Sequence, residues 1–305
     1  MGIKGLNKFL RNTCSKNIYQ VALWELQGKT IAIDTSIYLY KFNGEESELI
    51  DGFYHMISLF KYNEIIPLFV FDGKPPMEKY KTIEQRRCVK KQAEAKYNRI
   101  KETGERSNSV ELSQLRKKFV KVTNKDILNV KTLLGLMGVS YYECQGESDV
   151  ICVKLVEQNI AYACMSEDMD MFVYGCNKVL RYLSLLNSTV VVYDLNGILQ
   201  TLDITIQEFR DICIISGTDY NSTIDNIIHL QKALVLFMKY KQEGSLLGYM
   251  EWMHTKGHIT NINKVQSITQ IFDTNSIDTI PEKITNTYDL LGTKLFLEKH
   301  GFVFI

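Results

Sequence analysis

The chain has 305 residues, of which 45% are hydrophobic and 23% are charged. This balance is ordinary for a globular protein and excludes an intrinsically disordered chain. Its seven cysteines include no CxxC pair, which argues against a zinc site or a disulfide framework and fits a reducing, intracellular compartment. No apolar run approaches the length of a membrane span, so we expect no membrane partner.

Three short apolar runs each end at aspartates. "KTIAIDTSIYLY" reaches Asp34, "IIPLFVFDGKPP" reaches Asp72, and "IAYACMSEDMD" reaches Asp168 and Asp170. Continuous apolar runs of this length between helical stretches predict buried parallel strands. We therefore expect an α/β fold with a central, mostly parallel sheet flanked by helices. In such sheets, active sites gather at the carboxyl ends of the strands.

The basic part of the chain lies between these runs. Residues 74–131 contain 17 Lys and Arg residues against 7 Asp and Glu residues, although the formal net charge is only +1. The remaining chain is therefore net acidic. Such a segment often forms a surface for polyanions, but on charge alone a solvated pair of charged helices is the simpler interpretation.

The later segments predict helices with recognisable starts. "TNKDILNVKTLLGLMG" begins with a capping box, Thr123 with Asp126. "GESDVICVKLVEQ" carries Glu147 and Asp149 in its first turn, where the helix dipole favours carboxylates. "STVVVYDLNGILQ" predicts a strand, a turn and a helix start. A second capping box begins the helix predicted for "TIQEFRDICIISG", and we expect the chain after Tyr220 to be mainly helical.

Seven carboxylates stand at strand ends or helix starts, or in "IISGTDY". They are Asp34, Asp72, Glu147, Asp149, Asp168, Asp170 and Asp219. A single Asp after a strand is more often a turn former or a cap. In a parallel sheet, however, all seven would converge on one edge, where only cations keep them ionised. Oxygen ligands without His or Cys suit Mg²⁺ or Mn²⁺, and two such ions can promote phosphodiester hydrolysis.

Six motifs in one order resemble the flap endonuclease family of structure-specific 5′ nucleases. Over roughly residues 1–220 they are "MGIKGLNKFL", "IAIDTSIYLYKF", "LFVFDGKPP", "LMGVSYYECQGESD", "MSEDMDMFVYG" and "ISGTDY". The resemblance implies a metal-dependent enzyme that cuts 5′ flaps and other branched DNA near single-strand/duplex junctions. It also implies 5′→3′ exonuclease activity in DNA replication, repair or recombination. The compact chain, rich in Asn, Ile, Lys and Tyr, suggests a viral or divergent microbial member.

The resemblance also implies roles for individual residues. The seven carboxylates would hold two Mg²⁺ ions, which Mn²⁺ can replace, and Asp34, Asp72 and Asp170 would be catalytic. Asp149 stands where the family usually has Glu, so its shorter side chain favours a metal contact through water.

The family's catalytic basic pair falls on Lys79 and Arg86, seven residues apart and so on one helix face. Gly2 would lie beside the active site, where a small residue lets the backbone approach DNA. Tyr40 takes the place of an aromatic residue that stacks on a base, although a core tyrosine in an amphipathic helix explains it equally well.

The resemblance implies a single nuclease domain over residues 1–305. Within it, we expect an N-terminal region (1–105), a basic helical arch for the 5′ single strand (74–121), an internal region (122–220) and a helical C-terminal region (221–305). In the arch, Arg87 and Lys90 would contact phosphates without reading sequence. The stretch near 104–109, rich in Gly, Ser and Asn, is loop-like.

The chain departs from the family after Tyr220. Asn226-Ile227-Ile228 replaces the Gly-hydrophobic-Gly turn of a helix–hairpin–helix, and Ile does not adopt left-handed geometry cheaply. We therefore expect a degenerate hairpin. A sliding-clamp-binding box is not recognisable, and we expect a monomer that binds branched or flapped DNA in the nucleus or the cytoplasm. Two alternatives stay open: a non-catalytic nucleic-acid-binding protein that retains the fold, and a related RNA-directed 5′ nuclease.

Overall fold

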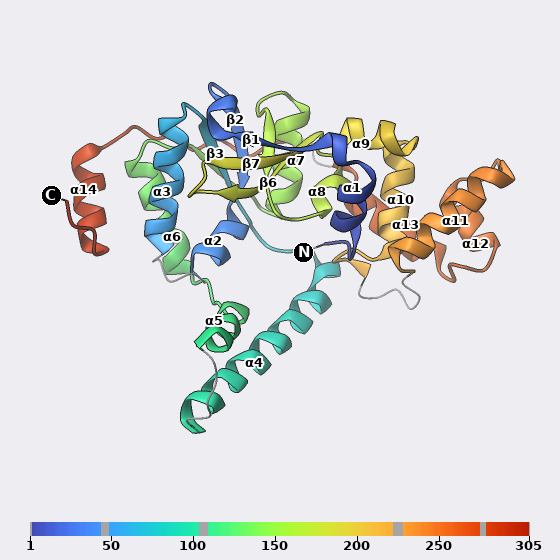
Figure 1. Cartoon of the computed structure of the whole chain (residues 1–305), viewed down its shortest axis with the longest axis horizontal. Helices are drawn as coiled ribbons and strands as arrows, with labels where there is room; N and C mark the ends of the chain where they lie inside the picture. Colours follow the sequence, from blue (N-terminus) through green and yellow to red (C-terminus); the bar gives the residue numbers. More distant parts are fainter. Residues whose placement is uncertain (1, 44–48, 104–108, 222–227, 275–278, 305) are drawn as a thin grey trace.

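A seven-stranded sheet forms the centre of the molecule (Figure 1). The computed structural model describes residues 2–43, 49–103, 109–221, 228–274 and 279–304. The strand order is β1-β7-β6-β5-β2-β3-β4, and the five strands from β6 to β4 are parallel, whereas β7 and β1 are antiparallel additions. The strands are β1 (Ile18–Ala22), β2 (Thr30–Asp34), β3 (Ile66–Phe71), β4 (Tyr141–Glu143), β5 (Ala163–Met165), β6 (Lys178–Ser184) and β7 (Thr189–Asp194). The expected mostly parallel sheet is confirmed.

Helices cover both faces of the sheet because strand side chains alternate between them. On β2, Ala32 points into one buried apolar cluster, and Ile31 and Ile33 point into the other. The first cluster includes α1 (Leu6–Thr13), α7 (Ser148–Glu157), α8 (Asp170–Tyr174) and α10 (Ile206–Ser216). The second includes α2 (Thr35–Asn43), α3 (Leu49–Tyr62) and α6 (Asn124–Leu136). The result is a three-layer arrangement with two cores.

The C-terminal helices extend the molecule at its two ends (Figure 1). After α9 (Leu195–Leu202) and α10, the helices α11 (Leu230–Glu243), α12 (Tyr249–Thr255) and α13 (Ile262–Ile271) form a lobe at one end. At the other end, α14 (Leu290–Lys299) packs against α6. The remaining short helical turns are η1 (Ser15–Asn17), η2 (Leu23–Leu26) and η3 (Met77–Lys79). The helical C-terminal region expected from the sequence is therefore present in the described residues.

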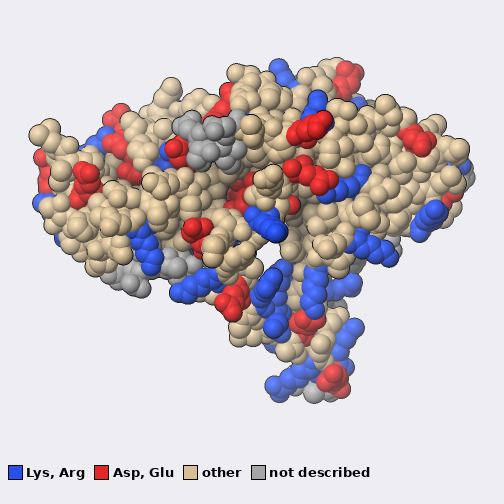
Figure 2. Space-filling view, turned by 180° about the vertical axis from the view of Figure 1, so that it is seen from behind, with Lys and Arg blue, Asp and Glu red and all other residues tan. Residues whose placement is uncertain are grey.

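A helical hairpin, α4 (Tyr80–Thr103) and α5 (Ser109–Lys118), projects from the body (Figure 1). A small apolar contact joins its two helices through Ala93, Ile100 and Leu115. The ion pairs Lys96–Glu111 at 2.9 Å and Lys121–Glu94 at 2.7 Å add to it. Lys and Arg side chains gather along the hairpin (Figure 2). Most of the loop expected near 104–109 lies outside the described residues.

The local features expected from the sequence, including both capping boxes, are present in the structure. Asp126 accepts a hydrogen bond from the Thr123 backbone N–H at 2.8 Å, and Thr123 Oγ1 accepts one from the Asp126 backbone N–H at 3.2 Å. The second capping box closes in the same way at the start of α10. All seven cysteines are free thiols, and six of them are buried. None of the described helices combines the length and the apolar character needed to cross a bilayer.

We expect Phe53→Ala to lower the free energy of unfolding by about 3–5 kcal/mol, because it leaves a cavity in the second core. Phe53 is fully buried, and its ring contacts those of Phe42 and Phe69 at 5.3 and 5.9 Å between centroids. Tyr62→Ala, on the same helix but 86% exposed, should change it by no more than about 0.5 kcal/mol. Denaturant unfolding of both variants tests this, and equal effects would contradict it.

Candidate active site

Acidic side chains gather at the carboxyl edge of the parallel strands. Asp34 is the last residue of β2, Asp72 directly follows β3, and Asp168 lies just after β5. Because these neighbouring strands run in the same direction, their carboxyl ends lie at one edge of the sheet. The helix α7 starts there too, with Glu147 at its N-cap position.

Three buried carboxylates lie close enough to share a cation. One oxygen from each of Asp168, Asp170 and Asp219 lies within 4.8 Å of the others. Asp170 Oδ1 is buried and has no hydrogen-bond partner among the described residues. Buried polar atoms are rarely left without a hydrogen-bond partner, and a hard cation bound to this oxygen would take the place of that partner. The residues therefore fit a divalent metal ion.

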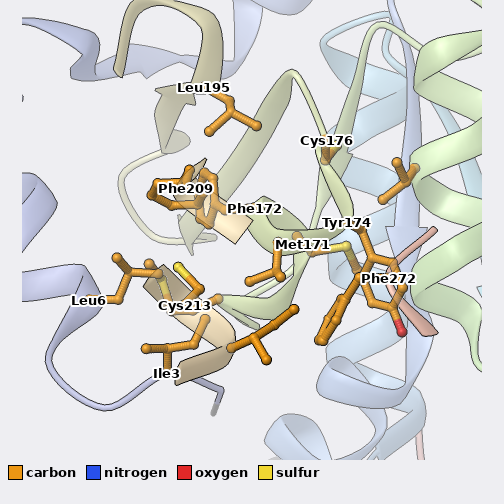
Figure 3. Close-up of a cluster of buried hydrophobic side chains, with 14 of the residues drawn as sticks. Ile3, Leu6, Met171, Phe172, Tyr174, Cys176, Leu195, Phe209, Cys213 and Phe272 are labelled. Atoms are coloured by element: carbon orange, nitrogen blue, oxygen red, sulfur yellow. The ribbon is translucent and has the colours of Figure 1, made fainter. Parts of the chain in front are cut away.

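Gly2 lies against these carboxylates. A Cβ added at Gly2 would lie 2.6 Å from Asp170 Oδ1 and 2.7 Å from Asp168 Oδ1, and the φ angle of Gly2 is 75°. Both the space and the backbone conformation therefore require glycine. Apolar packing holds this N-terminal segment in place: Ile3 and Leu6 point toward Cys213 of α10 (Figure 3).

Asp34 and Asp72 are held by serines that the sequence analysis did not single out. Ser166 Oγ donates to Asp34 Oδ2 at 2.9 Å, and Ser148 Oγ donates to Asp34 Oδ1 at 3.3 Å. The Ser148 backbone N–H donates to Asp72 Oδ1 at 2.6 Å, and Ser36 Oγ also donates to Asp72. Each of these serines lies within two residues of a predicted carboxylate in the sequence, which is the signal that could have identified them.

Burial and crowding raise the pKa values of three carboxyl groups in the cluster. Burial and then the charge of Asp72 raise the pKa of Asp34 to about 7. Burial and the charge of Asp34 raise the pKa of Asp149 well above its ordinary value. Burial and the charge of Asp168 do the same for Asp170. These three carboxyl groups thus feel the charges of their acidic neighbours, and nearby cations would favour their ionised forms.

Two basic side chains enter this cluster, Lys79 from the end of η3 and Arg86 from the second turn of α4. Lys79 Nζ donates to Glu147, and Arg86 Nη2 donates to both carboxylate oxygens of Asp219 at 2.7 and 2.6 Å. Burial by itself would lower the pKa of Lys79, but the charges of Glu147 and Asp149 raise it above its ordinary value. The structure thus brings all seven predicted carboxylates and the predicted basic pair together.

Hydroxyl groups that the sequence analysis also missed support two of the carboxylates. Tyr220 Oη donates to Glu147 and shares a 2.9 Å hydrogen bond with Tyr174 Oη. Thr82 Oγ1 donates to the backbone carbonyl of Asp219 at 2.6 Å. Tyr220 adjoins Asp219 in the sequence, but nothing in the sequence pairs Tyr174 or Thr82 with the site.

The other predicted DNA-contacting residues lie at the base of the hairpin, outside the cluster. Tyr40 is 46% exposed on α2, whereas its neighbour Tyr38 is buried, so the alternative of a core tyrosine is wrong. Lys90 Nζ lies 4.4 Å from the centroid of the Tyr40 ring and donates to the Val120 carbonyl at 3.2 Å. Arg87 is exposed on α4.

The predicted degenerate hairpin lies partly outside the described residues, which exclude Asn226 and Ile227. Ile228 is buried, and its backbone N–H donates to the Ile215 carbonyl of α10 at 3.2 Å. The helices α10 and α11 on either side of the segment pack together.

Comparisons with known proteins point to one family in both the N-terminal and the internal part of the chain. Residues 1–93 match the XPG N-terminal domain, and residues 138–219 match the XPG I-region. Flap endonuclease 1 of Xiphophorus maculatus is 34% identical over 276 residues, which cover 85% of this chain and 70% of that protein. Flap endonuclease 1 of Encephalitozoon cuniculi (strain GB-M1) is 33% identical over 264 residues, 81% of this chain and 75% of that protein.

Solved structures show the same fold. The catalytic core of Rad2 in complex with DNA substrate superposes with a TM-score of 0.67 at 22% identity, covering 98% of this chain and 95% of that one. Flap endonuclease-1 from Methanococcus jannaschii gives a TM-score of 0.64 at 24% identity, covering 93% and 90%. With two matching family regions and relatives above 30% identity, this chain belongs to the flap endonuclease family of structure-specific 5′ nucleases, which are metal-dependent, DNA-binding enzymes.

Proposed function

We propose that this nuclease uses two Mg²⁺ ions to cut 5′ flaps and other branched DNA near single-strand/duplex junctions, with 5′→3′ exonuclease activity. The observation that carries the proposal is the convergence of seven carboxylates and two basic side chains beside a basic helical hairpin. We further propose that it acts as a monomer, without a sliding-clamp-binding box, in the nucleus or the cytoplasm, as one nuclease domain over residues 1–305.

The donor set supports Mg²⁺, with Mn²⁺ as a substitute. Asp168, Asp170 and Asp219 form one group of oxygen donors. Asp34 and Asp72, bridged by Ser148, form a second with Asp149, and Glu147, next to Ser148 at the start of α7, would join them when an ion binds. Each group would hold one ion, and Asp149 would reach its ion through water. When bound, the ions would activate water and neutralise charge on the scissile phosphate.

Lys79 and Arg86 would bind the scissile phosphate and stabilise the charge that develops on it in the transition state. Without DNA they pair with Glu147 and Asp219, so each must exchange a carboxylate for a phosphate oxygen. Cations held by those carboxylates favour this exchange, because they weaken the attraction between the basic side chains and the acidic ones.

We propose that the hairpin of α4 and α5 is the arch through which the 5′ single strand passes. Lys and Arg side chains along it, Arg87 and Lys90 among them, would contact phosphates without reading sequence. Tyr40, exposed beside Lys90 at the hairpin base, would stack on a base near the scissile bond. Gly2 would let the DNA backbone approach Asp168 and Asp170 closely.

We expect the wild type to cut a 5′-flapped duplex in Mg²⁺ and Asp170→Asn to cut it more slowly by about 10³-fold or more, because losing a metal ligand removes several kcal/mol of transition-state stabilisation. Single-turnover cleavage measures this, and Glu251→Gln, an exposed carboxylate on α12, is the control that should keep the wild-type rate. Equal cutting by wild type and Asp170→Asn, or none by the wild type, would contradict the proposal. Comparing cleavage of this DNA flap with cleavage of a matched RNA flap tests the alternative of an RNA-directed nuclease.

We expect Tyr40→Ala to reduce cleavage of flapped DNA by an amount equivalent to about 1–3 kcal/mol, the typical contribution of one base–aromatic stack. Tyr40→Phe keeps the ring face and should retain nearly the full rate, since stacking does not require the hydroxyl. kcat/KM for both variants provides the measurement. A Phe variant as slow as the Ala variant would argue against stacking.

Removing metal should destabilise the folded chain in a pH-dependent way. The pKa of Asp34 is raised from 3.8 to about 7. A carboxyl group whose pKa is raised by folding opposes folding once it ionises, so this part of the free energy of unfolding falls as the pH rises from 3.8 to about 7. With EDTA above about pH 7, we expect a lower Tm than with Mg²⁺.

In the same assay, Asp170→Asn should raise the Tm in EDTA by about 2–4 °C for each kcal/mol of repulsion removed. It should also shrink the gain in Tm that Mg²⁺ gives to the wild type, because a ligand is lost. Glu251→Gln should behave as the wild type does. A wild-type Tm that does not respond to Mg²⁺ would contradict a metal site in this cluster.

A further inference from the structure

Arg181 of β6 is a buried cation that the nuclease mechanism does not use. Its side chain is 6% exposed. Its Nη2 donates to the Glu167 carbonyl at 2.9 Å, and its Nη1 contacts the Met169 sulfur at 2.8 Å. These two contacts lie on either side of Asp168 in the sequence. One guanidinium group therefore holds both neighbours of a candidate metal ligand.

The same guanidinium group is tied to the N-terminal helix. Arg181 Nη1 donates to Asn7 Oδ1 at 2.9 Å, and Tyr193 Oη of β7 donates to the same oxygen at 2.7 Å. Asn7 Nδ2 in turn donates to Tyr182 Oη at 2.8 Å. Asn7 lies in α1, five residues after Gly2, which itself contacts Asp168 and Asp170. The amide of Asn7 thus links the segment that carries Gly2 to the loop that carries Asp168.

The backbone next to Arg181 is distorted where it meets the Glu167–Met169 loop. Tyr182 has a φ angle of 57°, in the left-handed region that non-glycine residues rarely adopt, and the register of β6 with β7 shifts between Arg181 and Ser184. The Tyr182 backbone N–H donates to Glu167 Oε1 at 2.5 Å. The distortion therefore turns the strand toward Glu167, the residue before Asp168.

A role in stability alone explains this arrangement poorly. Arg181 Nε is buried without a hydrogen-bond partner among the described residues, and a buried charge usually stabilises a fold less than apolar residues of the same volume would. The guanidinium lies over the rings of Tyr182 and Tyr193. Among the described residues, the hydrogen bonds and the ion pair of its two Nη atoms are with the Glu167–Met169 loop and with α1.

We propose that Asn7 and Arg181 form a positioning pair that sets Asp168 and Gly2 relative to each other and thereby determines how tightly the Asp168, Asp170 and Asp219 group binds its metal ion. The inference rests on the metal site proposed above. Neither residue is one of the candidate metal ligands. They act through the backbone on both sides of Asp168 and through α1, as partners that orient a ligand commonly do.

Asn7→Ala tests the pair because it removes the shared acceptor and leaves Arg181 in place. We expect the Mg²⁺ concentration that gives half of the maximal gain in Tm to rise by about 10- to 100-fold, and the concentration for half-maximal cleavage to rise with it. KM for the flapped duplex should not change. Asn7→Asp keeps an oxygen acceptor for Arg181 and Tyr193 but loses the donor to Tyr182, so its Mg²⁺ midpoint should lie between those of Asn7→Ala and the wild type.

Asn17→Ala is the matched control. Asn17 Oδ1 also accepts a side-chain hydrogen bond, from Thr201 Oγ1 at 2.8 Å, but it joins η1 to α9, so its loss should leave the Mg²⁺ dependence unchanged. An Asn7→Ala variant with a lower Tm but a wild-type Mg²⁺ midpoint in both assays would overturn the inference. A wild type that neither gains stability nor cleaves DNA in Mg²⁺ would overturn the proposed metal site and the inference with it.

Discussion

Repulsion among carboxylates is the constraint on which the rest of this molecule depends. Parallel strands carry Asp34, Asp72 and Asp168 to one edge of the sheet, where burial and the charge of Asp72 raise the pKa of the buried Asp34 to about 7. Serine and tyrosine hydroxyls and two basic side chains offset part of the repulsion. The part that remains would favour the binding of divalent cations at this site.

The side chains that offset this repulsion also connect the helical hairpin of α4 and α5 to the site. Arg86 and Thr82 of α4 both bind Asp219, through its side chain and its backbone carbonyl, and Lys79 binds Glu147. The base of the helical hairpin is therefore fastened to acidic residues that would hold metal. In the proposed mechanism, metal binding, phosphate binding and the orientation of α4 would be coupled, because the same charged groups would take part in all three.

The N-terminal segment is part of the same site. Gly2 reaches Asp168 and Asp170 because Ile3 and Leu6 are anchored in the core beneath them (Figure 3). The polar contacts of α1, from Asn7 to Arg181 and Tyr182, lead to the loop that carries Asp168. The start of the chain and the loop that carries Asp168 are therefore held together by apolar packing on one side and by hydrogen bonds on the other.

The sequence by itself determined the strands that end at aspartates, the capping boxes, the carboxylate set and the family, because these depend on local patterns and on the order of motifs. It could not determine which hydroxyl groups hold the carboxylates or that Tyr40 is exposed. Ser148 lies 114 residues from Asp34, and Arg181 lies 174 residues from Asn7. Only the folded chain decides such contacts, since the packing of the sheet and its helices brings distant residues together, and no local pattern encodes that packing.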